Sequence, residues 1–209
     1  RAFNAQLLAE EEPAADETVL TSGKSYSNVF HANGGNAAFS VMANTLRGVY
    51  GTDVLLATAN SFTGSVLKAD YTPKMADSMI MPNGLMSRQR TMTGAELKET
   101  VRAYVEGCEG GFVPFNSGSL PIVSGIAVEV KEASGSYTLT GITRNGQPLR
   151  DDDTVTVTCL AAEKQMDVLL ASESGVSAGE DTWVKNTWRD HVSGGGAALA
   201  EPENYMTLR

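Results

Sequence analysis

The sequence predicts an α+β fold, with a mixed sheet that includes at least one β-hairpin and about three packing helices. Two observations along the chain carry this prediction. Segments with apolar residues at helical spacing follow good capping residues, and other segments alternate apolar with polar residues on either side of the dipeptide Asn145-Gly146. Strands and helices are therefore interspersed along the chain.

Two helices are predicted from their caps and from the spacing of their apolar residues. Asn36 can cap the first helix, with Phe39 opening its apolar face. Thr93 and Glu96 stand three residues apart and form a capping box for the second. Both signals are local, so each helix is expected to begin at its cap.

A third helix is predicted near residue 184. Asp181 can cap it, and the residues expected to face the core follow at helical spacing: Val184, Trp188 and Val192. Trp183 lies off this stripe. We therefore expect one of the two tryptophans in the core and the other at a surface or interface.

The strands are predicted from alternation and from one strong turn. Asn145 and Gly146 both tolerate a positive φ, which predicts a hairpin between a strand at 137–143 and a return strand at 154–159. Further strands are expected at 17–22, 52–59 and 126–130.

The chain divides into a short acidic start and one domain. Residues 1–16 are helical in composition but can bury little on their own, so they are expected to be a linker or one half of an interface. The 22.1 kDa chain is long enough for residues 17–209 to form a single domain with a real core.

The composition argues against several classes of partner. With 16 Lys and Arg against 25 Asp and Glu, the formal net charge is −9, so we expect no nucleic-acid partner. No apolar run approaches the roughly 20 residues of a membrane-spanning helix, so we expect no membrane segment. Cys108 and Cys159 lack nearby Cys or His, and either two buried thiols or one disulfide is consistent with them.

Few residues in this chain suit catalysis. His31 and His191 are its only histidines, and no metal-binding pattern surrounds them, so no hydrolytic metal centre is expected. Residues 175–179 match GxSxG but lack the flanking strand and helix of a nucleophile elbow, which predicts a surface loop. The acidic run at 151–153 is expected to be a solvated turn, with a calcium site as the alternative.

Three parts of the chain together carry a resemblance to a known family: the helix and strand at 35–61, the TGAELKE helix at 93–99 and the NGQPL hairpin at 145–149. In this order they resemble the C-terminal domain of the 5′-nucleotidase family, over about residues 17–209. In that family the domain follows a metallophosphoesterase domain and supplies the nucleoside pocket.

The resemblance implies a context for the chain. Residues 1–16 are expected to be the remnant of a linker helix to an N-terminal catalytic domain. No cofactor is expected in this chain, because a divalent metal would belong to that other domain. The resemblance also implies export, to the periplasm, the cell surface or the medium.

Compared residue by residue, the nucleotide pocket of the family is only partly kept. Asn60 occupies the place of the family's asparagine, but residues 61–65, which read SFTGS where the family has a run of glycines, an apolar residue and an arginine, lack that arginine. Pro82-Asn83 stands where the family has proline and a base-stacking phenylalanine. No aromatic residue lies at 159–167, where the second stacking ring is expected.

Four residues are the expected substrate-binding candidates: Asn60, Phe62, Asn83 and Arg88. Phe62 either supplies replacement stacking or covers the core. Arg88, which with Arg90 is expected to flank the second helix, either recruits an anion or is solvated. No catalytic or metal-binding residue is predicted.

Two functions follow from these expectations. The first is a substrate-specificity and binding domain of a 5′-nucleotidase-like phosphohydrolase, without catalysis of its own and with a degenerate nucleotide pocket. Its partners would be a nucleotide or other small ligand and the catalytic domain. The alternative is a non-enzymatic extracellular binding module descended from that family, and a serine hydrolase acting through Ser177 is the remaining and remote possibility.

Overall fold

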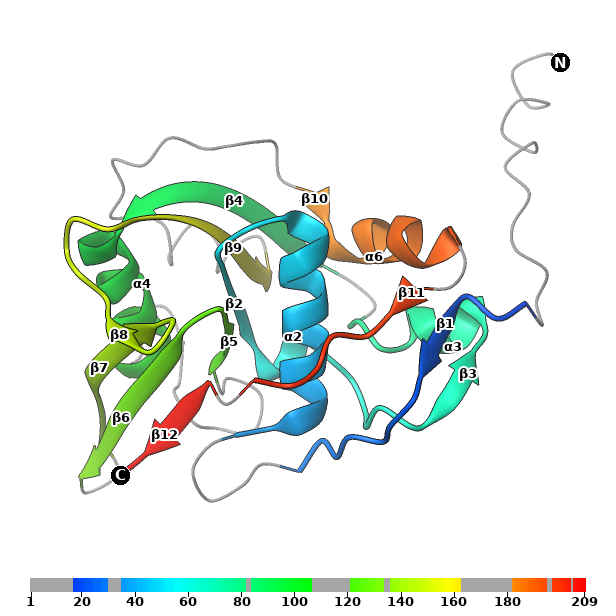
Figure 1. The fold of residues 1–209 in the computed structure, drawn as a ribbon, viewed down its shortest axis with the longest axis horizontal. Coiled ribbons are helices and arrows are strands. Elements are labelled where there is room, and N and C mark those ends of the chain that lie inside the picture. The colour runs from blue at the N-terminus through cyan, green and yellow to red at the C-terminus, as the bar shows by residue number, and fades with distance from the viewer. Residues whose placement is uncertain are drawn as a thin grey trace, which may run out of the picture.

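The computed structural model describes residues 17–29, 35–81, 84–106, 121–133, 136–162, 182–194, 197–203 and 205–209. The described part contains a five-stranded, a four-stranded and a three-stranded sheet together with four α-helices (Figure 1). The predicted α+β class is thus confirmed. The helices are α2 (Ala37–Tyr50), α3 (Pro73–Asp77), α4 (Gly94–Glu106) and α6 (Val184–Ser193), with a 3-10 turn η1 (Ala59–Ser61). The strands are β1 (Leu20–Ser22), β2 (Val54–Thr58), β3 (Ala69–Tyr71), β4 (Leu85–Thr93), β5 (Pro121–Ser124), β6 (Ala127–Ala133), β7 (Ser136–Arg144), β8 (Gln147–Pro148), β9 (Thr154–Ala162), β10 (Thr182–Trp183), β11 (Ala197–Ala198) and β12 (Met206–Leu208).

Strand β9 lies in the middle of the largest sheet, whose order is β10-β4-β9-β2-β5. It pairs with β4 antiparallel along its whole length and with β2 in parallel, so the sheet is mixed, as predicted. Side chains on both faces of β9 are buried, among them Val155, Val157, Cys159 and Leu160. A strand that is covered on both faces needs apolar side chains on both. The end of β9, which reads CLAA, meets this requirement.

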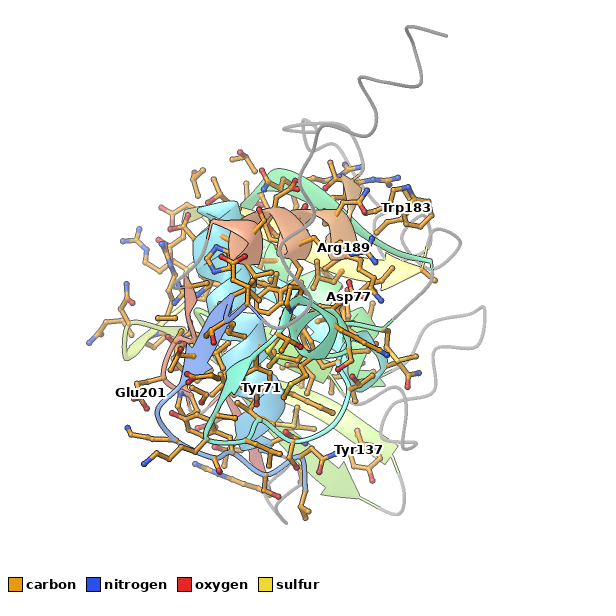
Figure 2. The ribbon with its side chains drawn as sticks, turned by 90° about the vertical axis from the view of Figure 1, so that its right-hand side faces the viewer. Tyr71, Asp77, Tyr137, Trp183, Arg189 and Glu201 are labelled. Atoms are coloured by element: carbon orange, nitrogen blue, oxygen red, sulfur yellow. The ribbon has the colours of Figure 1, made fainter. Side chains whose placement is uncertain are left out.

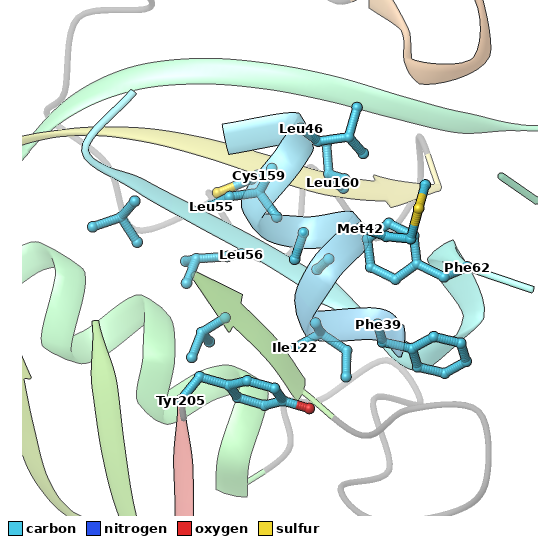
Figure 3. Close-up of a cluster of buried hydrophobic side chains, with 14 of the residues drawn as sticks. Phe39, Met42, Leu46, Leu55, Leu56, Phe62, Ile122, Cys159, Leu160 and Tyr205 are labelled. Atoms are coloured by element: carbon cyan, nitrogen blue, oxygen red, sulfur yellow. The ribbon is translucent and has the colours of Figure 1, made fainter. Parts of the chain in front are cut away.

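Helix α2 packs against β2 and β5 of this sheet. The side chain of Asn36 accepts a hydrogen bond from the backbone N–H of Phe39 at 3.0 Å, which confirms the predicted cap. Phe39, Met42 and Leu46 of the helix are buried, and they meet Leu55 and Leu160 of the sheet (Figure 3). The core therefore sits between α2 and the sheet.

Helix α4 begins at the predicted capping box. The backbone N–H of Glu96 donates to Thr93 Oγ1 at 3.2 Å, and the Glu96 carboxylate accepts from the backbone N–H of Thr93 at 2.7 Å. The helix lies against β7 and β4, with Leu97, Val101 and Tyr104 buried.

The Asn-Gly hairpin turn is confirmed, but its return strand differs from the prediction. Asn145 and Gly146 have φ of 52° and 74°, and β8 returns beside β7 for only two residues. The backbone N–H of Leu149 still donates to the carbonyl of Ile142 at 3.0 Å, and a second turn at 150–153 then sends the chain away. The predicted return strand at 154–159 instead becomes part of β9 in the other sheet.

Three further elements differ from the sequence-based expectations. Helix α6 begins after Trp183, which is its N-cap residue and makes no side-chain capping hydrogen bond, and Asp181, the predicted cap, lies outside the described residues. Helix α3 is capped by Thr72 and has only five residues, too few for a periodic signal. Strand β4 was not predicted, and it contains both Arg88 and Arg90, which therefore do not flank a helix as expected.

The last described segment crosses α2 and fastens it to the sheets. Ser40 of the helix exchanges two hydrogen bonds with the backbone of Glu203, at 2.8 and 2.9 Å, and Asn44 donates to the carbonyl of Glu201 at 2.8 Å. Beyond this crossing β12 pairs with β6, while before it β11 pairs with β1. We call residues 197–209 the strap.

Gly125, in the turn between β5 and β6, is expected to resist substitution. It has a φ of +83°, and a Cβ there would lie 2.0 Å from the carbonyl oxygen of Asp53. Gly125→Ala should therefore lower the free energy of unfolding by about 3 kcal/mol or more, measured by urea denaturation.

Gly146→Ala is the matched control, because Gly146 has a φ of +74° but no atom within 4 Å of the added Cβ. It should cost only the backbone strain, about 1 kcal/mol. Equal losses in the two variants would contradict the close contact between Gly125 and Asp53.

Candidate functional site

The ends of four strands meet at one edge of the five-stranded sheet. Strands β2 and β9 end there, while β4 and β5 run the other way and begin there. The register sets Leu85 opposite Ala162 and Pro121 opposite Thr58. The segments that connect these strands at this edge therefore begin close to one another. Ligands commonly bind at such edges of open sheets.

Asn60 lies at this edge and is exposed, in the 3-10 turn η1 directly after β2. The turn is closed by the backbone N–H of Phe62, which donates to the carbonyl of Ala59 at 3.3 Å. Asn83 precedes β4 but lies outside the described residues, as do Pro82 and the segment 163–167. The structure thus describes one of the two predicted amides.

Phe62 is part of the core. Its side chain is 3% exposed, and its ring centroid lies 5.8 Å from that of Phe39 on α2 (Figure 3). Its backbone forms an isolated bridge with Ile80. Of the two expectations for Phe62, its position agrees with the one in which it covers the core. A base could stack on this ring only if the ring left the core.

The polar loop after Phe62 uses its side chains within the protein. The hydroxyl of Thr63 donates to the carbonyl of Ser78, and its backbone N–H donates to the carbonyl of Met79 at 3.0 Å. Ser65 Oγ donates to Asn28 Oδ1 at 3.0 Å. These hydrogen bonds hold the loop in place within the protein.

Arg88 and Arg90 lie on one face of β4. Gln89, between them, donates its side-chain N–H to the carbonyl of Tyr50 on α2 at 3.3 Å. Because neighbouring residues of a strand point to opposite faces, both arginines point away from α2. Arg88 is half-buried and stands opposite Cys159 in the β4–β9 ladder.

Cys159 is a buried free thiol, 1% exposed. Burial raises its pKa to about 12, although the charges of Arg90 and Arg88 act in the opposite direction. The thiol is therefore neutral and unreactive at pH 7. Cys108, the other cysteine, lies outside the described residues.

Trp183 is a candidate that the sequence analysis did not select. It is 50% exposed on β10 (Figure 2), whereas Trp188 is buried and donates its indole N–H to the carbonyl of Ala76 at 2.8 Å. This confirms the expectation of one core and one surface tryptophan. Trp183 pairs with Met86 at the start of β4, so it stands along the same edge as Asn60.

A carboxylate on α3 anchors the helix that follows Trp183. Asp77 lies 2.8 Å from the Lys185 ammonium and 2.6 Å from Nε of Arg189, both on α6 (Figure 2). Burial alone would raise the pKa of Asp77, but the hydrogen bonds and charges of Arg189 and Lys185 outweigh it and hold that pKa below its ordinary 3.8. The start of α6 is thereby tied to α3.

The other predicted sites supply no reactive centre within the described ranges. No three His, Cys, Asp or Glu side chains there are placed to hold a metal ion. In the acidic turn, Asp151 pairs with Lys98 and Asp152 with Arg150, both at 2.8 Å. The GxSxG segment at 175–179 lies outside the described residues. None of the described helices is long and apolar enough to cross a membrane.

The sequence matches no protein-family model and no curated protein. The fold, in contrast, is shared with solved structures. The 5′-nucleotidase precursor from Thermus thermophilus matches 99% of this chain with 41% of its own, at a TM-score of 0.67 and 14% identity. The NAD nucleotidase of Haemophilus influenzae matches all of this chain with 41% of its own, at 0.67 and 16%.

A third similar structure is the sulfate thiohydrolase of Thermus thermophilus, bound to glycerol. It matches 99% of this chain with 38% of its own, at a TM-score of 0.64 and 13% identity. The chain thus spans about two fifths of the length of these proteins. At such low identity the comparison establishes the fold, and it confirms the 5′-nucleotidase-like fold expected from the sequence.

The Asp77 anchor should contribute to stability only while its carboxylate is ionised. Since folding lowers its pKa, its contribution is complete above the unfolded value near 3.8 and is lost as the pH falls through the folded value. Asp77→Asn should therefore lower the free energy of unfolding by about 1 kcal/mol at pH 7, and this loss should shrink progressively as the pH falls below about 3.8, measured by urea denaturation over that range.

Asp190→Asn, on the anchored helix α6, is the control. Asp190 is exposed and forms no ion pair within the described residues, so its replacement should leave stability nearly unchanged over the same pH range. A penalty for Asp77→Asn that does not shrink as the pH falls would show that the amide destabilises the protein for a reason other than its missing charge.

Proposed function

We propose that this chain is a substrate-specificity and binding domain of a 5′-nucleotidase-like phosphohydrolase, not catalytic by itself and with a degenerate nucleotide pocket. The observation that carries the proposal is the match of nearly the whole chain to about two fifths of solved nucleotidase structures. The names of two of those proteins suggest a nucleotide or a related small molecule as the ligand.

The residues of this chain do not suit a metallophosphoesterase centre. The sequence has only two histidines, and the described residues bring no set of metal ligands together. A divalent metal and the hydrolytic step would therefore belong to an N-terminal catalytic domain, with residues 1–16 as the remnant of the linker to it. Export from the cell is part of the same proposal.

The residues described at this edge of the sheet support the proposal that the nucleotide pocket is degenerate. Asn60 remains exposed there, but Phe62 is committed to the core and the hydroxyls of Thr63 and Ser65 bond within the protein. A lost stacking ring costs about 1–3 kcal/mol and a lost arginine hydrogen bond about 1.5–3 kcal/mol. Two rings and one arginine would therefore weaken a micromolar site to millimolar or worse.

The same observations favour a second candidate, a non-enzymatic extracellular binding module descended from the family. The two candidates differ in whether a catalytic domain belongs to the protein. The coding sequence upstream of Arg1 separates them, since the first requires DxH and GNH metal-binding motifs there and the second does not.

The catalytic part of the proposal is tested with the chain alone. It should hydrolyse neither AMP, nor a UDP-sugar, nor p-nitrophenyl phosphate, with or without Mn²⁺, Zn²⁺ or Ca²⁺, in a phosphate-release assay or, for the nitrophenyl ester, by absorbance. The reason is the missing ligand set. Turnover above the blank that survives repurification and is abolished by EDTA would overturn it.

The degenerate pocket is tested by titrating AMP against the protein by calorimetry or NMR. The dissociation constant should be weaker than about 100 μM, and Asn60→Ala should change it less than about twofold, because one amide without its rings and arginine holds little. Asn145→Ala, an exposed amide in the distant hairpin, is the control. Tighter binding that Asn60→Ala weakens would mean that this loop still works.

A further inference from the structure

A cleft of about 340 Å³ opens between the turn of the Asn-Gly hairpin, the start of β6 and the strap. Its volume lies within the range of small-molecule binding sites. Asp53, which lines the cleft, directly precedes β2, whereas Asn60 follows it, so the cleft lies at the opposite edge of the sheet from Asn60. Four of the residues that line it are charged: Arg47, Asp53, Arg144 and Glu203.

The four charged side chains form two ion pairs. Nη2 of Arg144 donates to Oδ1 of Asp53. Nη2 of Arg47 donates to Oε1 of Glu203 at 3.2 Å. Burial alone would raise the pKa of Asp53, but the hydrogen bonds of Thr156 and the charges of both arginines outweigh it and hold that pKa below its ordinary 3.8. All four charges are therefore close to one another, and they sum to zero.

The ion pairs leave polar atoms of the cleft free to meet a ligand. Within the described residues, Arg144 donates only through Nη2, so its Nε and Nη1 have no partner there. Each oxygen of Glu203 accepts one hydrogen bond, although a carboxylate oxygen has two lone pairs. The hydroxyl of Thr143 and the side-chain amide of Asn145 also line the cleft, and neither bonds to another described residue.

The backbone of Gly125 forms the floor between the two ion pairs. Its N–H donates to Oε2 of Glu203 at 3.1 Å. A Cβ there would lie 2.0 Å from the carbonyl oxygen of Asp53 and 3.1 Å from Cδ of Arg47. Nε of Arg47 is held in addition by Ser124 Oγ, at 2.9 Å. Charged groups that are held in place before a ligand arrives lose little freedom when it binds.

The balance of charge in the cleft selects among classes of ligand. An anion would meet two carboxylates as well as two guanidiniums, in a chain with a formal net charge of −9. A cation would meet both guanidiniums. A neutral polyol would form only hydrogen bonds in which one partner is uncharged, and these are weaker than bonds between two ions. A zwitterion adds no net charge and can set each of its poles against an opposite charge.

We propose that this cleft binds a free α-amino acid with a neutral polar side chain, in its zwitterionic form. The ligand's carboxylate accepts hydrogen bonds from Arg144, and its ammonium donates to Glu203. Its side chain meets the hydroxyl of Thr143 and the amide of Asn145. The inference goes beyond the proposed function and does not depend on it, because it concerns a different ligand at the opposite edge of the sheet.

The test is an NMR titration that follows the backbone N–H signals of Gly125 and Gly146, which both line the cleft, with Gly64 as a reference outside it. L-Glutamine should shift both signals in a saturable way in the millimolar range. N-acetyl-L-glutamine lacks the ammonium, and L-glutamine amide lacks the carboxylate. Each should bind at least about fivefold more weakly, because each loses one charge-assisted contact.

Variants assign the two poles of the site. Arg144→Gln should weaken L-glutamine at least about fivefold and leave the amide, which has no carboxylate, unchanged. Arg144→Lys keeps the charge beside Asp53 with fewer donors, so it should weaken L-glutamine less. Glu203→Gln should weaken L-glutamine and leave the N-acetyl form unchanged. A general loss of structure would instead weaken every ligand and move the Gly64 signal.

Arg150→Gln is the matched control. Arg150 also pairs with an aspartate, Asp152, at 2.8 Å, but it does not line the cleft, so its replacement should leave L-glutamine binding unchanged.

The inference is overturned if Gly125 and Gly146 show no saturable shift up to about 50 mM L-glutamine. It is also overturned if the two blocked forms bind as tightly as L-glutamine, since the cleft would then not recognise both poles. An affinity that neither Arg144→Gln nor Arg144→Lys changes, or that Glu203→Gln leaves unchanged, would overturn it too. All of these results would leave the proposed function standing, because that function is tested with nucleotides.

Discussion

The pairing of β9 with two strands of opposite direction holds the domain together. One side of β9 forms a ladder with β4 from Thr154 to Ala162, and the other side meets β2 in parallel. Its side chains fill the core on both faces of the sheet. Without this strand, β2 and β4 would not belong to one sheet, and the edge that gathers Asn60, Met86 and Trp183 would not exist.

The features that the sequence predicts well are those decided within a few residues. The cap at Asn36, the capping box at Thr93 and the turn at Asn145 each depend on atoms three positions away or fewer, and all three form as expected. The partner of β9 is decided by contacts far along the chain. Its alternation identifies a strand, but alternation does not say which strand lies beside it. The turn at 150–153 ends the hairpin before the expected return strand begins.

The candidate site shows the same division. The exposed position of Asn60 follows from its place after a buried strand, whereas the role of Phe62 depended on whether the core had room for its ring. Trp183 was expected at the surface but was not selected as a site residue, because only the fold pairs it with Met86 at the start of β4. The one sign of this in the sequence was that Trp183 lies outside the apolar stripe of α6. Asn83 stays a prediction, because it lies outside the described residues.

The strap contacts elements that are synthesised much earlier, so the order of synthesis affects how the domain folds. Strand β1 belongs to the earliest described part of the chain, but its parallel partner β11 and the segment that crosses α2 lie far along the chain from it, as the pairing of Leu20 with Ala197 shows. At ribosomal rates of about 5–20 residues per second, β1 waits on the order of ten seconds or more for that partner. The domain can therefore close only after residues 197–209 have left the ribosome, and a message cut short before them would yield a chain in which β1 lacks its parallel partner and α2 lacks the segment that crosses it.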